Sequence, residues 1–234
     1  MVRQFKLAAD YRENRMELDR ARRRALLALA AGIGLPAALR LALAQSSTKQ
    51  GVRTAQGEVA ISGKPAEPGT LVRPGDTIVL GSGAIATFVV GEDAFLMRGN
   101  SHAELIGIGT LVSALQLVTG KLLGVFGSGG ERRLVTATAT IGIRGTGAYI
   151  EAEPTRTYFC LCYGTADVAA MMGGARESYS TRHHESPRYI YGDGRKRAIA
   201  PARVTNHTDS ELILLESLAG RSPPQSFMDS PIRY

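Results

Sequence analysis

The chain has 234 residues, of which 44% are hydrophobic, 21% charged and only 6% aromatic, with 27 glycines and two cysteines. This apolar fraction is enough to fill a hydrophobic core, and it excludes a disordered chain, a collagen, a disulfide-rich scaffold and a protein with many membrane spans. The formal net charge of +7 is typical of proteins that bind nucleic acid or a membrane surface, so its position along the chain decides what it means.

Residues 1–44 have the organisation of a targeting segment. A polar, basic stretch ends in Arg22-Arg23-Arg24, and an apolar run over residues 25–39 follows it. At about 1.5 Å per residue, this run is too short to cross a bilayer core of about 30 Å. Ala42-Leu43-Ala44 then provides a small-x-small cleavage site. The sequence therefore predicts a signal peptide, or alternatively an uncleaved anchor over residues 25–44, and both place the rest of the chain in the periplasm.

The paired Arg23-Arg24 before Ala25 and Leu26 resembles the twin-arginine export signal. That resemblance implies export of a protein that is already folded, often with a cofactor already inserted. Residues 1–44 carry nine basic and four acidic side chains, so +5 of the net charge belongs to them and only +2 to the remainder. We therefore expect no nucleic-acid partner, and a membrane contact only through an uncleaved N-terminal segment.

The region after the targeting segment predicts an all-β domain over residues 45–170. Short runs rich in Val, Ile, Thr, Phe and Tyr are separated by turns with glycine or proline, and no long amphipathic helix interrupts them. This spacing is typical of a sandwich, a barrel or a solenoid. The expected strands are 57–61, 77–79, 85–90, 94–98, 103–108, 113–119, 121–126, 134–138, 140–144, 147–151, 158–163 and 166–171.

Several of these stretches occur in an order that resembles the FecR domain. The turn Arg73-Pro74-Gly75-Asp76 is similar to the "pGD" turn of that family, and Gly120-Lys121-Leu122 is similar to its "l..G.l" turn. Residues 139–146 (ATIGIRGT) and 161–168 are similar to its "gvrGT" signature and its closing "v..G.v.v". The resemblance covers residues 51–170 and implies a FecR-like sandwich or solenoid that acts as a sensory module outside the cytoplasm.

Residues 171–234 are expected to form a C-terminal extension. The basic, turn-rich stretch 176–203 predicts a solvated loop or a face for an anionic ligand. Thr208 and Glu211 then form a T-x-x-E capping box, and Gly220 ends the helix that the box begins. The sequence therefore predicts one short helix that docks on the β domain by its leucines, followed by an irregular tail.

The two cysteines, Cys160 and Cys162, are two positions apart in an expected strand, so both thiols face the same side of it. A separation of about 6.6 Å along the strand strains a disulfide, but two thiols on one face suit zinc or copper(I). Three histidines follow, His183, His184 and His207, and because neighbours on a strand face opposite ways, only one of the first two is expected to join the cysteines. These five residues are the candidate metal site. The alternatives are a disulfide, or two buried cysteines with the histidines in surface or capping positions.

The chain contains no nucleophile elbow, P-loop, zinc-protease helix or haem-attachment motif. We therefore expect no enzymatic activity, no catalytic residue and no cofactor other than the candidate metal. The leading hypothesis is a periplasmic FecR-like module that binds an envelope protein or a small ligand. The alternatives are a periplasmic metal-binding or redox protein built on the cysteines and histidines, and a structural protein of the cell envelope.

Overall fold

The computed structural model describes residues 50–230. The signal peptide or anchor predicted for residues 1–44 lies outside the described residues. Within residues 50–230, no helix is long and apolar enough to cross a membrane.

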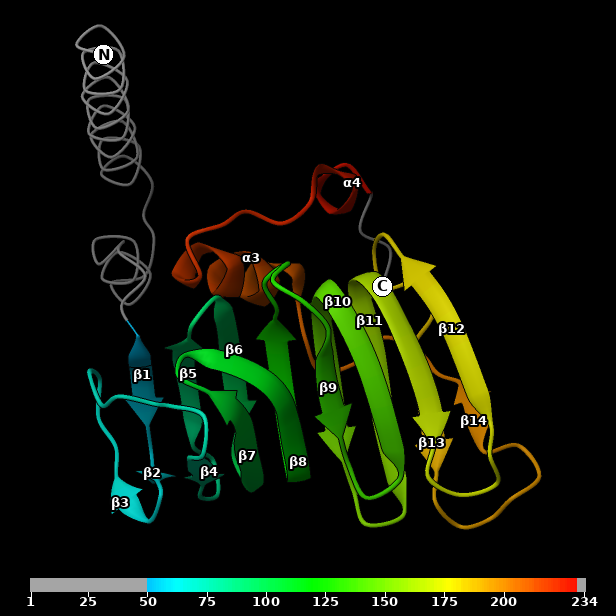
Figure 1. Ribbon diagram of the computed structural model, residues 1–234, viewed down its shortest axis with the longest axis horizontal. Coiled ribbons are helices and arrows are strands. Elements are labelled where there is room, and N and C mark those ends of the chain that lie inside the picture. Colours follow the sequence, from blue (N-terminus) through cyan, green and yellow to red (C-terminus); the bar gives the residue numbers. More distant parts are fainter. Residues whose placement is uncertain (1–49, 231–234) are drawn as a thin grey trace, which may run out of the picture. The chain divides into compact units, whose positions relative to one another are not determined.

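The described part of the chain consists of strands and two short helices near its C-terminal end (Figure 1). This confirms the all-β class and the short C-terminal helix. The first seven strands are β1 (Gly51–Gln56), β2 (Val59–Ile61), β3 (Lys64–Pro65), β4 (Thr77–Leu80), β5 (Ile85–Val90), β6 (Asp93–Arg98) and β7 (Ser101–Ile108). The next seven are β8 (Leu111–Val125), β9 (Arg132–Val135), β10 (Ala139–Ala152), β11 (Arg156–Ala170), β12 (Arg176–Thr181), β13 (Arg188–Tyr191) and β14 (Ile199–Pro201), and the helices are α3 (Asp209–Leu218) and α4 (Gln225–Met228).

The fourteen strands belong to one hydrogen-bonded sheet. Three long strands, β8, β10 and β11, change neighbours part-way along their length. The first part of β8 pairs with β7, and its second part pairs with β6 and β10. Likewise, β11 pairs with β13 through residues 156–159 and with β12 through residues 164–169. The long strands therefore carry the sheet from one layer into another, in a sandwich-like arrangement.

The sequence predicted two shorter strands in place of each of these long ones, and that prediction was wrong. Gly120 and Gly164 were interpreted as turns, but each lies inside a strand with a left-handed φ, of +96° and +103°. In β10, Gly145 also has a left-handed φ, of +54°, and the pairing with β11 shifts register at this residue. Because glycine adopts such angles without steric cost, each strand bends where it changes neighbours and does not end.

Five strands form where the sequence predicted none: β1, β3, β12, β13 and β14. The last three lie in the basic stretch that was expected to be a loop, so the sheet continues past residue 170. Strand β12 alternates exposed and half-buried residues and pairs only with β11. An edge strand of this kind has no apolar run, so its sequence does not distinguish it from a loop.

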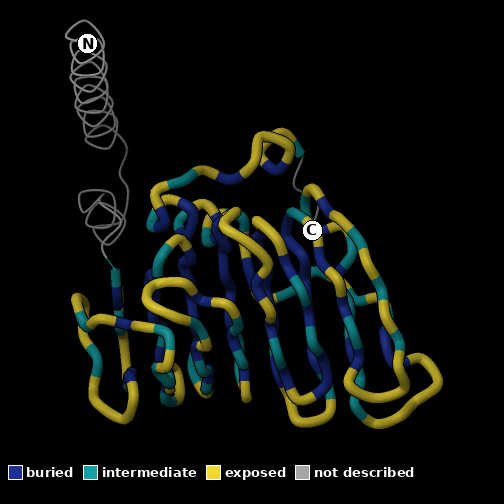
Figure 2. The backbone as a smooth tube through the Cα atoms, in the orientation of Figure 1, coloured by how far each residue is buried: buried dark blue, intermediate teal, exposed yellow. Residues whose placement is uncertain are grey.

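The strands of one layer are buried on both faces, because they separate two hydrophobic clusters (Figure 2). Side chains alternate between the faces, as at Phe88 and Val89, or at Phe95 and Leu96. The inner core between the layers includes Ile78, Phe88, Phe95, Met97, Leu105, Leu115, Leu122, Ile141, Ile150, Phe159, Leu161 and Val168. The outer cluster consists of Val89, Ala94, Leu96, Leu123, Val125, Tyr149, Tyr158, Cys160, Cys162 and Tyr163, with Leu212, Leu215, Ala219 and Phe227 from the C-terminal segment.

The bend at Gly120 generates a stability prediction. A Cβ added at Gly120 would overlap the backbone of Ser101 and lie 2.6 Å from its Cβ, whereas a Cβ added at Gly69, with a similar φ of +98°, would meet nothing within 4 Å. Both alanine variants incur the left-handed backbone cost of about 1–2 kcal/mol, but only Gly120→Ala adds a clash. In urea denaturation, we expect Gly120→Ala to lose at least about 2 kcal/mol more unfolding free energy than Gly69→Ala. Equal losses in the two variants would contradict this role of Gly120.

Candidate metal centre

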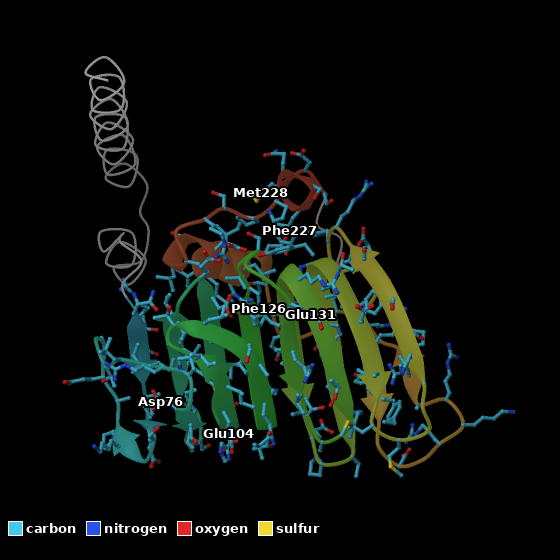
Figure 3. The ribbon with its side chains drawn as sticks, in the orientation of Figure 1. Asp76, Glu104, Phe126, Glu131, Phe227 and Met228 are labelled. Atoms are coloured by element: carbon cyan, nitrogen blue, oxygen red, sulfur yellow. The ribbon has the colours of Figure 1, made fainter. Side chains whose placement is uncertain are left out.

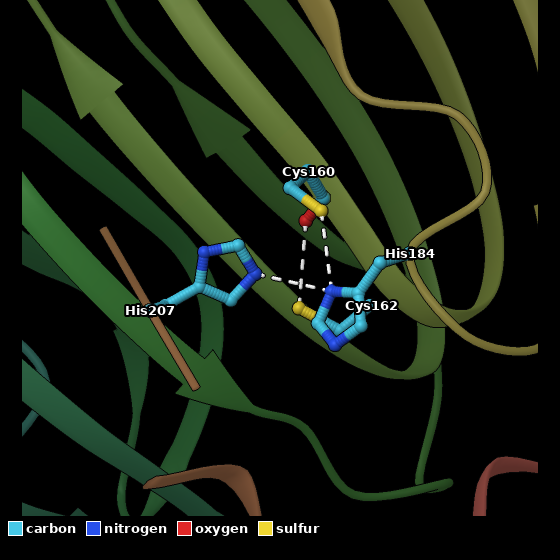
Figure 4. A group of neighbouring side chains, drawn as sticks. All are labelled: Cys160, Cys162, His184 and His207. Atoms are coloured by element: carbon cyan, nitrogen blue, oxygen red, sulfur yellow. Dashed lines mark hydrogen bonds between the residues drawn. The ribbon is translucent and has the colours of Figure 1, made fainter. Parts of the chain in front are cut away.

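Four of the five candidate residues lie together beneath the C-terminal segment: Cys160, Cys162, His184 and His207 (Figure 4). One sulfur or nitrogen atom from each lies within 4.8 Å of those of the other three. The four residues are 0%, 0%, 4% and 6% exposed, respectively. Two thiols and two imidazoles in a closed, buried group are the donor set of structural zinc sites.

Strand β11 presents both thiols to the same side. Cys160 and Cys162 belong to the outer cluster, whereas the neighbouring Phe159 and Leu161 point into the inner core. This confirms the alternation predicted from the sequence. The two cysteines are not joined to each other by a disulfide in this structure, and the Cys162 thiol lies 3.8 Å from the carbonyl oxygen of Cys160.

His184 reaches the thiols from the loop between β12 and β13. Its backbone has a φ of +58°, and its N–H donates to the carbonyl of Cys162 at 3.0 Å. This conformation places its Nδ1 3.4 Å from the Sγ of Cys160. His183 does not join the four side chains, and its Nε2 lies 2.9 Å from the Oδ2 of Asp209. Both histidines lie in a loop, so the alternation rule for a strand does not apply to them.

His207 directly precedes Thr208, the N-cap residue of α3. The capping box of Thr208 and Glu211 forms as the sequence predicted, and it fixes where the helix begins. The ring of His207 stacks on Tyr149 with 4.5 Å between the ring centroids. Its Nδ1 lies 2.7 Å from the carbonyl oxygen of Thr205, and its Nε2 faces the group of thiols.

The outward hydrogen bonds of the two histidines set which nitrogens carry protons. The carbonyl of Thr205 and the carboxylate of Asp209 only accept, so Nδ1 of His207 and Nε2 of His184 donate to them, at 2.7 and 3.1 Å. In neutral rings, Nε2 of His207 and Nδ1 of His184 then both present lone pairs, and these atoms are 3.1 Å apart. Two lone pairs at this distance repel each other unless a proton or a metal ion lies between them.

The separations match those around a tetrahedral ion. Bonds of about 2.3 Å to sulfur and about 2.0–2.1 Å to nitrogen place a sulfur and a nitrogen ligand about 3.5 Å apart, and two nitrogens about 3.3 Å apart. The corresponding distances here are 3.4 Å from Cys160 to His184 and 3.1 Å from His184 to His207. The donor atoms of Cys160, His184 and His207 thus have two separations close to those around a zinc ion, and all four donors lie within 4.8 Å of one another.

The cluster also favours a thiolate. Burial alone would raise the pKa of the Cys160 thiol, but hydrogen bonds with Cys162, His184 and His207 outweigh it and hold that pKa well below its usual value. Burial and the neighbouring Cys160 raise the pKa of Cys162. For His184, burial lowers the pKa, whereas Cys160 and Asp209 raise it and prevail. Cys160 is thus the more acidic thiol, and the thiolate is the form that binds metal ions.

Asp209 is the residue of the site that sequence reasoning missed. It is the first residue of α3, and its two carboxylate oxygens lie 2.9 and 3.1 Å from the Nε2 atoms of His183 and His184. A carboxylate that holds the far nitrogen of a metal-binding histidine is a common outer partner in metal sites, because it orients the ring and fixes its tautomer. The signal in the sequence was an acidic residue two positions after a candidate ligand, at a helix start.

Two other features of the surface lie apart from these four side chains. A groove of about 650 Å³ is lined by Arg98, Lys121, Glu151 and Glu153 among others, and none of the four side chains lines it. In the basic stretch, arginines pair with nearby acids and stack on tyrosines: Arg188 with Glu177 and Tyr179, and Arg195 with Asp193 and Tyr191. Arg156, at the start of β11, pairs with Glu153 and stacks on Tyr189 of that stretch.

No protein-family model matches the chain, and no curated protein matches it. Solved structures that resemble part of it include two crystal structures of a candidate anti-sigma factor from Parabacteroides distasonis ATCC 8503, at 1.65 and 2.50 Å resolution. Their sequence identities are 10% and 9%, and their TM-scores are 0.44 and 0.45. Each match covers 54% of this chain and 59% of the other, so the chain spans less than two thirds of that protein.

Proposed function

We propose that this protein binds one transition-metal ion, zinc, at a closed site formed by Cys160, Cys162, His184 and His207. The observation that carries the proposal is the convergence of two thiols and two imidazole nitrogens in a buried space, with the outer nitrogens of both rings already engaged. Because the outer nitrogens are bound to oxygen atoms, the inner nitrogens of both rings are directed towards the thiols, as the ligands of a metal ion are.

Charge and coordination number favour zinc over copper(I). Zn²⁺ with two thiolates and two neutral imidazoles makes a neutral site, whereas Cu⁺ leaves a net negative charge among residues that are at most 6% exposed. The carboxylate of Asp209, beside His184, would add to that negative charge. A set of four donors within 4.8 Å of one another also matches the usual coordination number of zinc.

The closed donor set supports a structural or sensing role for the ion. A catalytic zinc site keeps one position open for water or substrate, whereas here four protein side chains surround the centre. The ion would join strand β11, the loop after β12 and the start of α3, which are far apart in the sequence.

We expect full-length protein purified without chelators to contain about one zinc ion per chain, held at nanomolar affinity or tighter. The double variant Cys160→Ser/Cys162→Ser should hold less than about a tenth of that, because it lacks both sulfur ligands. His102→Ala, which removes a histidine that belongs to neither group of possible metal ligands, is the matched control and should keep its zinc. Elemental analysis for zinc and copper, followed by zinc titration of the metal-free protein, makes the measurement.

Wild-type protein that contains no zinc and takes up none would contradict the proposal, and so would copper in place of zinc. Thiol titration in guanidinium with a chelator supplies the second check. Two reactive thiols per chain are expected, whereas none would mean that Cys160 and Cys162 form a disulfide.

A second candidate function, a binding or signalling module in the periplasm, is favoured by the FecR-like motifs and the twin-arginine-like segment. One observation supports it: the "pGD" turn forms a closed turn, in which Gly75 has a φ of +97° and the backbone N–H of Arg73 donates to the carboxylate of Asp76 at 2.8 Å. Its partner would be an envelope protein or a small ligand. The two functions are compatible, because twin-arginine transport carries folded proteins and so allows an ion to be bound before export.

Export can be tested on the paired arginines. Replacing Arg23 and Arg24 together with lysine should leave the full-length protein in the cytoplasm, because the twin-arginine pathway reads the guanidinium pair and not charge alone. Arg12→Lys/Arg15→Lys, in the same segment, is the matched control and should not affect export. Cell fractionation in the bacterial host measures how much of each variant is exported, and equal export of both variants would argue against this route.

A further inference from the structure

The C-terminal segment, residues 203–230 and here called the strap, covers the outer cluster. Leu212 and Leu215 of α3 are fully buried, and Phe227 of α4 is 2% exposed (Figures 1 and 3). Met228, the next residue, is 51% exposed. The strap therefore packs one side of its helices onto the sheet and leaves the other in solvent.

Beneath the strap lies an apolar sheet face. Val89, Leu96, Leu123, Val125 and Tyr149 are between 0% and 4% exposed, and all belong to the cluster that includes the strap residues. Their strands are covered on the opposite face by the inner core. Movement of the strap would consequently uncover a patch of this face, and exposed patches of that kind typically bind other proteins.

The start of the strap is attached to the sheet mainly by polar contacts. The hydroxyl of Tyr158 donates to the carbonyl of Arg203 at 3.0 Å, and the side-chain amide of Asn206 donates to Glu151 at 2.7 Å. His207 and Asp209 both reach His184. The candidate metal centre is thus located where the strap begins.

The later part of the strap has contacts of its own. Glu216, only 4% exposed, accepts a hydrogen bond from the hydroxyl of Tyr163 at 2.5 Å and pairs with Arg221 at 2.8 Å. Arg98 pairs with Glu211 at 2.8 Å. The two parts of the strap are therefore held differently: the beginning by the metal-binding side chains, and the end by apolar packing and ion pairs.

We propose that the metal ion latches the beginning of the strap to the sheet, so that its loss loosens residues 203–209 and exposes part of the outer cluster. This inference rests on the proposed metal-binding function and names its regulation. The four-ligand site exists only while His207 lies beside β11 and His184, so the ion binds the docked strap more tightly than a loosened one. A ligand with such a preference shifts the population towards the docked state.

Loss of the ion would remove the link between the strap and the thiols. His207 is the strap residue among the four ligands, and Cys160, Cys162 and His184 lie outside the strap. Without the ion, His207 keeps its stack on Tyr149 and its contact with His184, whereas its bond to Thr205 lies within the strap itself. Thr205, His207 and Asp209 all lie within the first seven positions of the strap.

Hydrogen–deuterium exchange of the full-length protein tests the latch. In metal-free protein, prepared with a chelator and a thiol reductant, we expect the amides of residues 203–209 to exchange at least about tenfold faster than in zinc-loaded protein. Strands β1 to β7 should exchange at the same rate in both. Mass spectrometry of peptic peptides resolves the two regions.

Linkage provides an independent test with a matched pair of variants. Leu215→Ala removes a fully buried contact of the strap without touching a ligand, so it should weaken zinc affinity by about tenfold, since coupling is reciprocal. Ile213→Ala, on the same helix but 40% exposed, should bind zinc as the wild type does. Equal affinities for the two variants would overturn the latch.

The outcomes separate this inference from the function on which it rests. If the protein binds zinc but the strap exchanges equally with and without it, the latch is wrong and the zinc site stands. Uniformly faster exchange over the whole described region would also overturn the latch, because the ion would then stabilise the entire fold. If zinc does not bind at all, both the proposed function and the latch fail.

Discussion

The approach of two imidazole nitrogens is the constraint from which the candidate site follows. Nδ1 of His184 and Nε2 of His207 lie 3.1 Å apart, and the other nitrogen of each ring donates to an oxygen that can only accept. Neutral rings held in this way repel each other unless a proton or a metal ion lies between them. The thiols of Cys160 and Cys162 lie beside this pair and complete the donor set.

The fold provides this arrangement by burying one layer of the sheet on both faces. Because the inner core already covers one side of β11, the thiols on its other side can be buried only by a further covering segment. The strap serves that purpose and brings His207 and Asp209 with it. The capping box at Thr208 fixes where α3 starts, and so it sets the positions of the residues on either side. The site therefore depends both on the local capping of α3 and on the packing of the strap against the sheet.

The sequence predicted what depends on local pattern, and it failed where distant segments decide the outcome. Alternation in β11 placed both thiols on one side, and the T-x-x-E pattern gave the helix start correctly. The continuity of β8, β10 and β11 was missed because glycine permits a bend as readily as a turn, and only the partner strands distinguish the two. One of His183 and His184 was expected beside the cysteines because of strand alternation; His184 does lie there, but it reaches them from a left-handed position in a loop. Asp209 was missed because its partners lie 25 and 26 residues away.

X-ray absorption at the zinc edge of the zinc-loaded, full-length protein tests the central claim most directly, since it counts the ligand atoms around the ion. Two sulfur atoms at about 2.3 Å and two nitrogen atoms at about 2.0–2.1 Å are predicted, with imidazole scattering in the outer shells. A shell of nitrogen and oxygen without sulfur would contradict the claim, because it would place the ion away from Cys160 and Cys162.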